Sequence, residues 1–158
     1  MANFILGESI RRLDERYRLS LPTDLAEPLE TEGAECVLAK ERPGCLSLWN
    51  AVRWKPRLED GVRLVEAKIQ AGRLAGDLED VQRLGRLLST RHRPVQLAGR
   101  GRLVVPEGFR EFLGVEPGGT VMVVGAAVCV EIWHPETWSK YVGDQMPAFR
   151  KLLEELAS

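Results

Sequence analysis

Cysteine and histidine are scarce in this chain, which has three of the first and two of the second among its 158 residues. The cysteines Cys36, Cys45 and Cys129 are odd in number and show no Cys-x-x-Cys spacing. The sequence therefore indicates neither a disulfide framework nor a zinc site, and no cofactor is expected. We predict that Cys45 and Cys129 are small core residues in matching strands, and that the protein works in a reducing, cytoplasmic compartment.

The chain also has no excess of positive charge and no long apolar run. Its formal net charge is -1, so any binding to a polyanion must rest on a local patch of basic residues. The longest apolar run, residues 121–130, is far shorter than the roughly 20 residues of a membrane helix, and the N-terminal segment has no basic leader before an apolar core. We therefore expect a soluble protein without a membrane segment or an export signal.

The sequence repeats itself at an offset of 84 residues. Residues 13–54 align with residues 97–138 without a gap, so that “RYRLSLP” matches “RGRLVVP”. Twelve of the 42 aligned positions are identical, and all four tryptophans keep step with one another. This repeat is too long for the common solenoid families, and we predict two related halves that share one compact unit.

Each half has the pattern of a short strand, a tight turn, a second strand, a short helix and a hairpin. In the turns, “LDERYRLSL” and “LAGRGRLVV” place polar residues and glycine between apolar ones, and Gly99 and Gly101 can take the positive φ of a hairpin turn. A proline after each second strand favours short helices at residues 23–29 and 107–113, of which Pro28 should end the first early. The turns “ERPG” and “GAA” are expected to join the two hairpins.

Two longer amphipathic helices are predicted between the halves. Apolar residues at helical spacing are Leu58, Val62, Val65 and Ile69 in one, and Leu78, Val81, Leu84 and Leu88 in the next. Asp77 should cap the second helix and Pro94 should end it. A third amphipathic helix, “AFRKLLEELAS”, needs a neighbour for its apolar face. The expected organisation is a first half at residues 1–54, a helical spacer at 55–93, a second half at 94–138 and a C-terminal helical segment at 139–158.

The pattern of tryptophans and histidines indicates structural roles more than base stacking, catalysis or metal binding. Because the four tryptophans repeat with the same spacing, packing of each hairpin end against the following helix is favoured over stacking on nucleic-acid bases. No Cys, Ser or carboxylate pattern surrounds His92 or His134, so we predict solvated turn residues, with His134 as the cap of the helix that Pro135 begins.

The chemistry of the chain depends on an Arg-x-Arg element that occurs in both halves. Side chains two apart on a strand point to the same face, so Arg16 and Arg18 should project together, as should Arg100 and Arg102. A two-stranded ribbon with such paired guanidinium groups fits the major groove of DNA or its phosphates. Alternatively, Arg18 pairs with Asp14 across its own turn and only stabilises the hairpin.

Local charge distinguishes the two halves. Residues 86–110 contain six arginines against one acid, whereas residues 24–35 contain five acids and no basic residue. If neutralisation of phosphates drives affinity, the second half should dominate DNA binding. For Arg86, Arg91 and Arg93, a role in solvating the end of a helix is favoured over DNA contact.

Several segments resemble the MraZ family of bacterial transcription regulators, which have a SpoVT/AbrB-like fold. They are “LDERYRLSLP”, “GRGRLVVPEGFREFLGV”, a hairpin ending in “VEIW”, and “HPETW”. The family's Asp-x-x-x-Arg signature corresponds to Asp14 and Arg18 in the first half, and to Arg102 alone in the second half, where Ala98 replaces the acid. Of the arginines that often follow the proline in this family, the chain keeps Arg110 and has Asp24, Leu25 and Ala26 in the first half.

The resemblance implies an α+β fold of tandem AbrB-like β-α-β halves. Their swapped hairpins would form a β-barrel with pseudo-twofold symmetry, with helices between the halves and at the C-terminus. It also implies ring-like homo-oligomers that bind short direct repeats upstream of a division and cell-wall gene cluster, at the nucleoid.

Two functions of different class follow from the sequence. The first is a DNA-binding transcriptional regulator, with double-stranded DNA and further copies of itself as partners and with no membrane or small-molecule substrate. Its candidate DNA-binding residues are Arg16, Arg18, Arg100, Arg102 and Arg110. The second is an oligomeric scaffold that keeps the barrel but no longer binds DNA, which Ala98 and the acidic first half favour. An enzyme is the least supported, because no set of residues offers a base, a nucleophile or a metal site.

Overall fold

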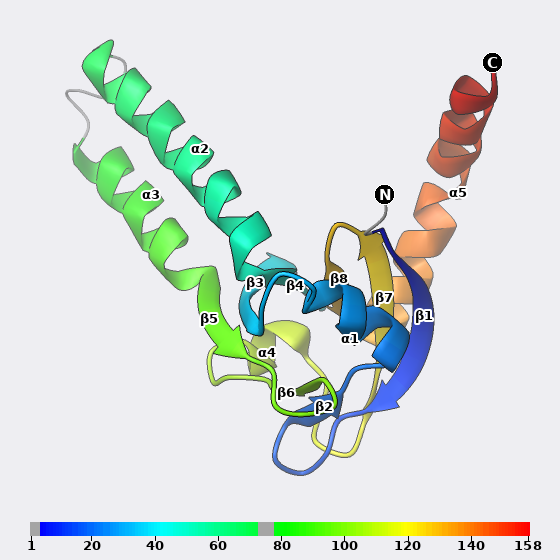
Figure 1. Ribbon diagram of the computed structural model, residues 1–158. Helices are drawn as coiled ribbons and strands as arrows, with labels where there is room; N and C mark the ends of the chain where they lie inside the picture. The colour runs from blue at the N-terminus through cyan, green and yellow to red at the C-terminus, as the bar shows by residue number, and fades with distance from the viewer. Residues whose placement is uncertain (1–3, 73–77) are drawn as a thin grey trace.

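The computed structural model describes residues 4–72 and 78–158, and the expected cap Asp77 lies outside them. In the first half the described elements are β1 (Ile5–Arg12), β2 (Arg18–Ser20), α1 (Thr23–Leu29), β3 (Glu35–Arg42) and β4 (Cys45–Asn50). The spacer consists of α2 (Ala51–Gln70) and α3 (Leu78–Thr90). The second half contains β5 (His92–Gln96), β6 (Arg102–Val104), α4 (Arg110–Leu113), β7 (Thr120–Ala127) and β8 (Val130–Trp133), and α5 (Pro135–Ala157) follows it (Figure 1).

The strands form one antiparallel sheet of six strands and a separate ribbon of two. The sheet has the order β1-β7-β8-β4-β3-β5, and the ribbon pairs β2 with β6. Interchanging the halves leaves this order unchanged, because β1 corresponds to β5, β3 to β7 and β4 to β8. The first strand of each half pairs with the hairpin of the other half. The chain is therefore a mixed α+β structure in which the halves exchange strands.

The expected closed barrel is not formed among the described strands. β1 and β5 are the two ends of the strand order, so the six-stranded sheet is open. The short strands of the ribbon pair with each other and with neither edge, and so they do not complete the ring of backbone hydrogen bonds that a closed barrel requires.

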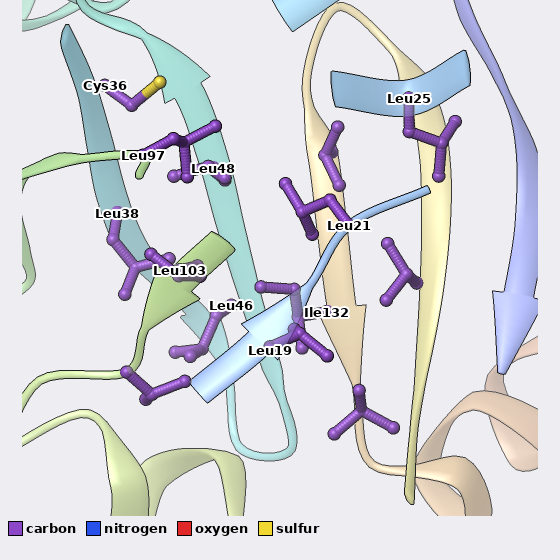
Figure 2. Close-up of a cluster of buried hydrophobic side chains, with 14 of the residues drawn as sticks. Leu19, Leu21, Leu25, Cys36, Leu38, Leu46, Leu48, Leu97, Leu103 and Ile132 are labelled. Atoms are coloured by element: carbon purple, nitrogen blue, oxygen red, sulfur yellow. The ribbon is translucent and has the colours of Figure 1, made fainter. Parts of the chain in front are cut away.

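The core lies between the ribbon and one face of the sheet. Figure 2 shows Leu19 and Leu103, from the middle of the two ribbon strands, among the side chains of Leu46 and Ile132 from β4 and β8. All four are at most 1% exposed, and burial of a side chain of this size contributes about 1.5–3 kcal/mol. Since neighbouring side chains on a strand alternate between faces, the flanking ribbon residues are exposed, among them Arg18 and Arg102.

The short helices and the second hairpin differ from the expected bounds by a few residues. The first helix covers residues 23–29 as expected, but Pro28 lies inside its last turn and does not end it early, so that prediction was wrong. In the second half, Gly108 has a φ of 86°, which interrupts the expected helix, so that α4 begins only at Arg110. The segment “GAA” continues β7 to Ala127 instead of forming the turn. Within it Gly125 allows β1 to approach, because a Cβ there would lie 2.5 Å from the carbonyl oxygen of Ile5.

Helices α2 and α5 begin at side-chain caps. Asn50 caps α2 by accepting the backbone N–H of Val52 at 2.9 Å. His134 caps α5 as expected, since its Nδ1 accepts the N–H of Glu136 at 3.1 Å. The expectation for Pro94 was wrong: α3 ends at Thr90, and Pro94 lies within β5, where an edge strand tolerates the missing N–H.

The repeated tryptophans pack each hairpin end against the following helix, as expected. The ring centroids of Trp49 and Trp54 are 5.8 Å apart, and those of Trp133 and Trp138 are 5.2 Å apart. The three cysteines are buried. No helix in the two described ranges is long and apolar enough to cross a membrane.

Candidate nucleic-acid interface

The turn that precedes β2 is organised by Asp14. One carboxylate oxygen, Oδ1, accepts the backbone N–H groups of Arg16 at 2.8 Å and Arg18 at 2.9 Å. The other, Oδ2, accepts Nε–H of the Arg18 guanidinium at 2.7 Å. The Arg18 N–H, with smaller contributions from its guanidinium, lowers the pKa of Asp14 from 3.8 to about 2, so the carboxylate is charged at neutral pH. The ion pair between Arg18 and Asp14, which the sequence offered as the alternative to DNA contact, is present.

The equivalent turn before β6 is held by its backbone alone. Ala98 and Arg102 exchange two hydrogen bonds, with N···O distances of 2.9 and 3.2 Å. The left-handed residues between them are Arg100 and Gly101, with φ of 67° and 68°. A positive φ was expected at both Gly99 and Gly101. The structure has it at Gly101 but not at Gly99. Among the described residues no carboxylate lies within 4.0 Å of the Arg102 guanidinium.

The predicted pairing within each Arg-x-Arg element is wrong, because its first arginine lies in a turn and not on a strand. β2 begins at Arg18 and β6 begins at Arg102, so the alternation of a strand does not reach Arg16 or Arg100. The structure instead brings together the second arginine of each half. Arg18 lies opposite Val104, and Ser20 lies opposite Arg102, which makes the two arginines diagonal neighbours on the exposed face, roughly 7–8 Å apart.

Two grooves flank the ribbon, and Arg18 and Arg102 line both of them. The first groove, of 540 Å³, is lined by four arginines and two acids: Arg11, Arg12, Arg18, Arg102, Asp14 and Glu15, together with Ser20. The second groove, of 720 Å³, also contains four arginines but only one acid: Arg18, Arg93, Arg102, Arg110 and Glu107. Edge strand β1 borders one groove and edge strand β5 borders the other, so the ribbon lies between the two edges of the sheet.

Three of the groove arginines are missing from the set predicted from the sequence. Arg11 and Arg12 are at the end of β1, and Arg93 is on β5. The sequence showed “RR” two residues before Asp14, but only the strand order reveals that it faces a groove. Arg16 and Arg100 are exposed and are absent from both groove linings. The five acids of residues 24–35 line neither groove.

Arg110 forms a clamp on the first turn, although it belongs to the second half. Its Nε–H donates to the carbonyl of Val105 at 2.8 Å, and its guanidinium carbon lies 4.1 Å from the ring centroid of Tyr17. Val105 in turn donates its N–H to the carbonyl of Tyr17 at 2.9 Å. Tyr17 is the left-handed residue of the Asp14 turn, with a φ of 59°. This clamp of Arg110, Val105 and Tyr17 therefore holds the turn that carries Arg18.

The equivalent contact in the other half has no clamp. By the offset of 84 residues, Gly101 corresponds to Tyr17, and Ala26 corresponds to Arg110. Leu21 donates its N–H to the carbonyl of Gly101 at 3.0 Å, as Val105 does to Tyr17. A Cβ at Gly101 would lie only 2.9 Å from that of Ala26. The backbone geometry is thus repeated, while the side chains are small where the other half has large ones.

Comparisons with known proteins find relatives that match over nearly the whole chain. The family described as MraZ protein, putative antitoxin-like, matches residues 92–156. The chain is 31% identical to a transcriptional regulator MraZ of Heliobacterium modesticaldum over 151 residues, which cover 96% of this chain and 95% of that protein. Proteins with the same description from Acetivibrio thermocellus and Shewanella baltica are 26% and 29% identical, again over 96% of this chain and over 95% and 92% of their own lengths.

Proposed function

The chain belongs to the MraZ family, and we propose on this basis that it is a transcriptional regulator that binds double-stranded DNA with the β2–β6 ribbon and its two grooves. One observation supports this most strongly. A chain of net charge -1 gathers six arginines around one exposed ribbon, with three acids among them. Such a local excess of guanidinium groups suits a polyanion that the chain as a whole would not attract.

The two central arginines would have different roles in this complex. Arg102 has no carboxylate within ion-pair distance among the described residues, so both edges of its guanidinium are available for bidentate contact with a guanine or a phosphate. Arg18 is oriented by Asp14, whose charge offsets part of its own. The groove arginines Arg11, Arg12 and Arg93 would contact phosphates, which fix the position of the ribbon on the duplex.

The architecture supports two finer parts of the proposal. Exchange of strands between the halves and the position of the ribbon between both sheet edges suit an AbrB-like, swapped-hairpin arrangement. We also propose a homo-oligomer, such as a ring, because large apolar residues are exposed on β1, directly before it and on α5: Phe4, Leu6, Ile10, Met146, Phe149, Leu152, Leu153 and Leu156. A ring would present several ribbons to the short direct repeats upstream of a division and cell-wall gene cluster, in the cytoplasm at the nucleoid.

A titration of labelled DNA from the gene's own upstream region, followed by fluorescence anisotropy at several salt concentrations, tests this function. Arg102→Ala should weaken binding by about 1–3 kcal/mol and relax sequence preference if Arg102 reads a base, or reduce the salt slope by roughly one if it contacts a phosphate. Arg18→Ala should have a smaller effect. Arg63→Ala is the matched control, since Arg63 is exposed on α2 and lines neither groove.

The oligomeric scaffold predicts a different outcome for the same titration. It would be supported if the wild-type protein showed no salt-dependent DNA binding, or if folded Arg102→Ala protein bound as tightly as wild type.

A further inference from the structure

A hollow of about 320 Å³ lies between the spacer helices and β3, away from the ribbon grooves. Its apolar wall consists of Trp54 and Leu58 from α2, Leu87 and Leu88 from α3, and Ala39 from β3. This volume falls within the range of about 300–1000 Å³ that is usual for small-molecule sites, which are mostly apolar with a few polar groups. No step of the proposed DNA binding uses this hollow.

One wall of the hollow contains a hydrogen-bond donor without an acceptor. The Nε1 atom of Trp54 is buried and has no partner among the described residues, although buried donors are nearly always satisfied. The two tryptophans at the hairpin ends differ: Nε1 of Trp49 donates to Ser47 Oγ at 2.9 Å, and Nε1 of Trp133 donates to Glu131 Oε1 at 3.0 Å. Trp54 therefore differs from Trp49 and Trp133 in having no acceptor for its indole N–H among the described residues.

Positive charge outweighs negative charge around the hollow. The guanidinium carbon of Arg57 lies 4.3 Å from the ring centroid of Trp49 and 5.4 Å from that of Trp54, and Arg57 makes no ion pair in the described residues. Arg91 is fixed at the rim because its Nη2 donates to the carbonyls of Lys40 and Glu41. The one carboxylate in the lining, that of Glu41, already accepts the Ser47 hydroxyl.

We propose that this hollow is a binding site for small apolar monoanions, such as aromatic carboxylates. The apolar body would lie against Trp54, Leu58 and Leu88, and the carboxylate would lie toward Arg57. Stacking beside an indole would use the Trp54 ring that lines the hollow, and the carboxylate would pair with the Arg57 guanidinium, which has no ion pair in the described residues. The inference does not depend on DNA binding, and a failure of one leaves the other standing.

Isothermal titration calorimetry with 1-naphthoate and its uncharged analogue 1-naphthamide tests the site in the full-length protein. Gly61 lines the hollow on α2, and a Cβ there meets no atom within 4 Å, so Gly61→Leu fills the hollow and favours the helix. Gly85→Leu is the matched control, because Gly85 is a helical glycine with equal space that does not line the hollow. Thermal melts by circular dichroism establish that both variants are folded.

Wild-type protein and Gly85→Leu protein should bind 1-naphthoate with equal affinity, and Gly61→Leu should weaken binding by at least about tenfold. Arg57→Gln should weaken binding of 1-naphthoate by about fivefold or more while leaving that of 1-naphthamide unchanged. The proposal is overturned if wild-type protein does not bind 1-naphthoate at millimolar concentration. It is equally overturned if Gly61→Leu binds it as tightly as Gly85→Leu, or if Arg57→Gln weakens both compounds alike.

Discussion

Replacing Arg110 by alanine removes the clamp on the first ribbon turn and tests whether that contact stabilises the protein. The substitution eliminates the hydrogen bond from Nε to Val105, at 2.8 Å, and the stacking of the guanidinium on Tyr17, at 4.1 Å. A hydrogen bond from a charged donor contributes about 1.5 kcal/mol, and an exposed cation–π contact adds about 0.5–1 kcal/mol. We therefore expect the free energy of unfolding to fall by about 2 kcal/mol, which lowers the Tm of a chain this long by about 4–8 °C.

Urea unfolding followed by tryptophan fluorescence, at one fixed protein concentration, measures this loss. A double-mutant cycle with Tyr17→Leu isolates the stacking, since leucine keeps the apolar contact and the same strained φ but has no ring. The coupling free energy should be about 0.5–1 kcal/mol. Additive effects of the two substitutions, or a loss below about 0.5 kcal/mol for Arg110→Ala, would refute the clamp.

The same variant separates a structural role of Arg110 from the predicted DNA contact. If Arg110 contacts a phosphate, the slope of log affinity against log salt should decrease by roughly one in Arg110→Ala. If it acts only through the turn of Arg18, affinity should fall while the slope stays at the wild-type value.

Three further predictions follow from ionisable groups. The folded-state pKa of Asp14, about 2, is below its ordinary 3.8. Wild type should therefore be more stable than Asp14→Asn above about pH 4 and should lose this difference as pH falls toward 2, which urea unfolding at a series of pH values measures. Burial raises the pKa of Glu131, so its charged form destabilises the folded protein. Glu131→Gln keeps an acceptor for Trp133 and should be more stable than wild type at about pH 8, with an advantage that disappears as pH falls. A variant that is less stable than wild type at about pH 8 would contradict this. Burial also raises the pKa of the thiols, to about 11 for Cys36 and about 12 for Cys129. Ellman's reagent should therefore label the cysteines only after unfolding, and rapid labelling of the native protein would contradict this.

The internal repeat predicted the arrangement of the fold better than its closure. An offset of 84 residues without gaps leaves no room for a different element order, and the strand order is indeed unchanged when the halves are interchanged. The alternation of “RLSL” and “RLVV” agrees with the burial of Leu19 and Leu103 beside the exposed Arg18 and Arg102. Whether the sheet closes depends on hydrogen bonds between its edge strands, and no local pattern of apolar residues encodes these.

The turns show why the candidate site was only partly predictable. The sequence suggested a strand from Arg16 to Arg18, but the position of the left-handed residue decides where the strand begins. In the first turn, Asp14 accepts two N–H groups and the left-handed residue is Tyr17. In the second turn, no such carboxylate exists, and both Arg100 and Gly101 take positive φ. The two turns are therefore held differently, but in both of them the left-handed residue directly before the strand, Tyr17 or Gly101, leaves only the second arginine on the strand.

The contact between positions 17 and 110, and its counterpart between 101 and 26, shows that the halves share a backbone geometry while their side chains differ. Each contact joins the turn of one half to the helix region of the other, so its two members lie in different copies of the repeat. Tyr17 is accommodated by Arg110, which stacks on it, whereas position 101 has no room for a side chain, because its Cβ would lie 2.9 Å from Ala26. A tyrosine at position 101 would thus clash unless the partner half changed as well. The ribbon therefore presents Arg18, which is paired with Asp14 on a turn that Arg110 clamps, beside Arg102, whose turn is held by backbone hydrogen bonds alone. A ribbon of this kind has two unequal halves, and DNA bound across it would meet a different set of charges on either side.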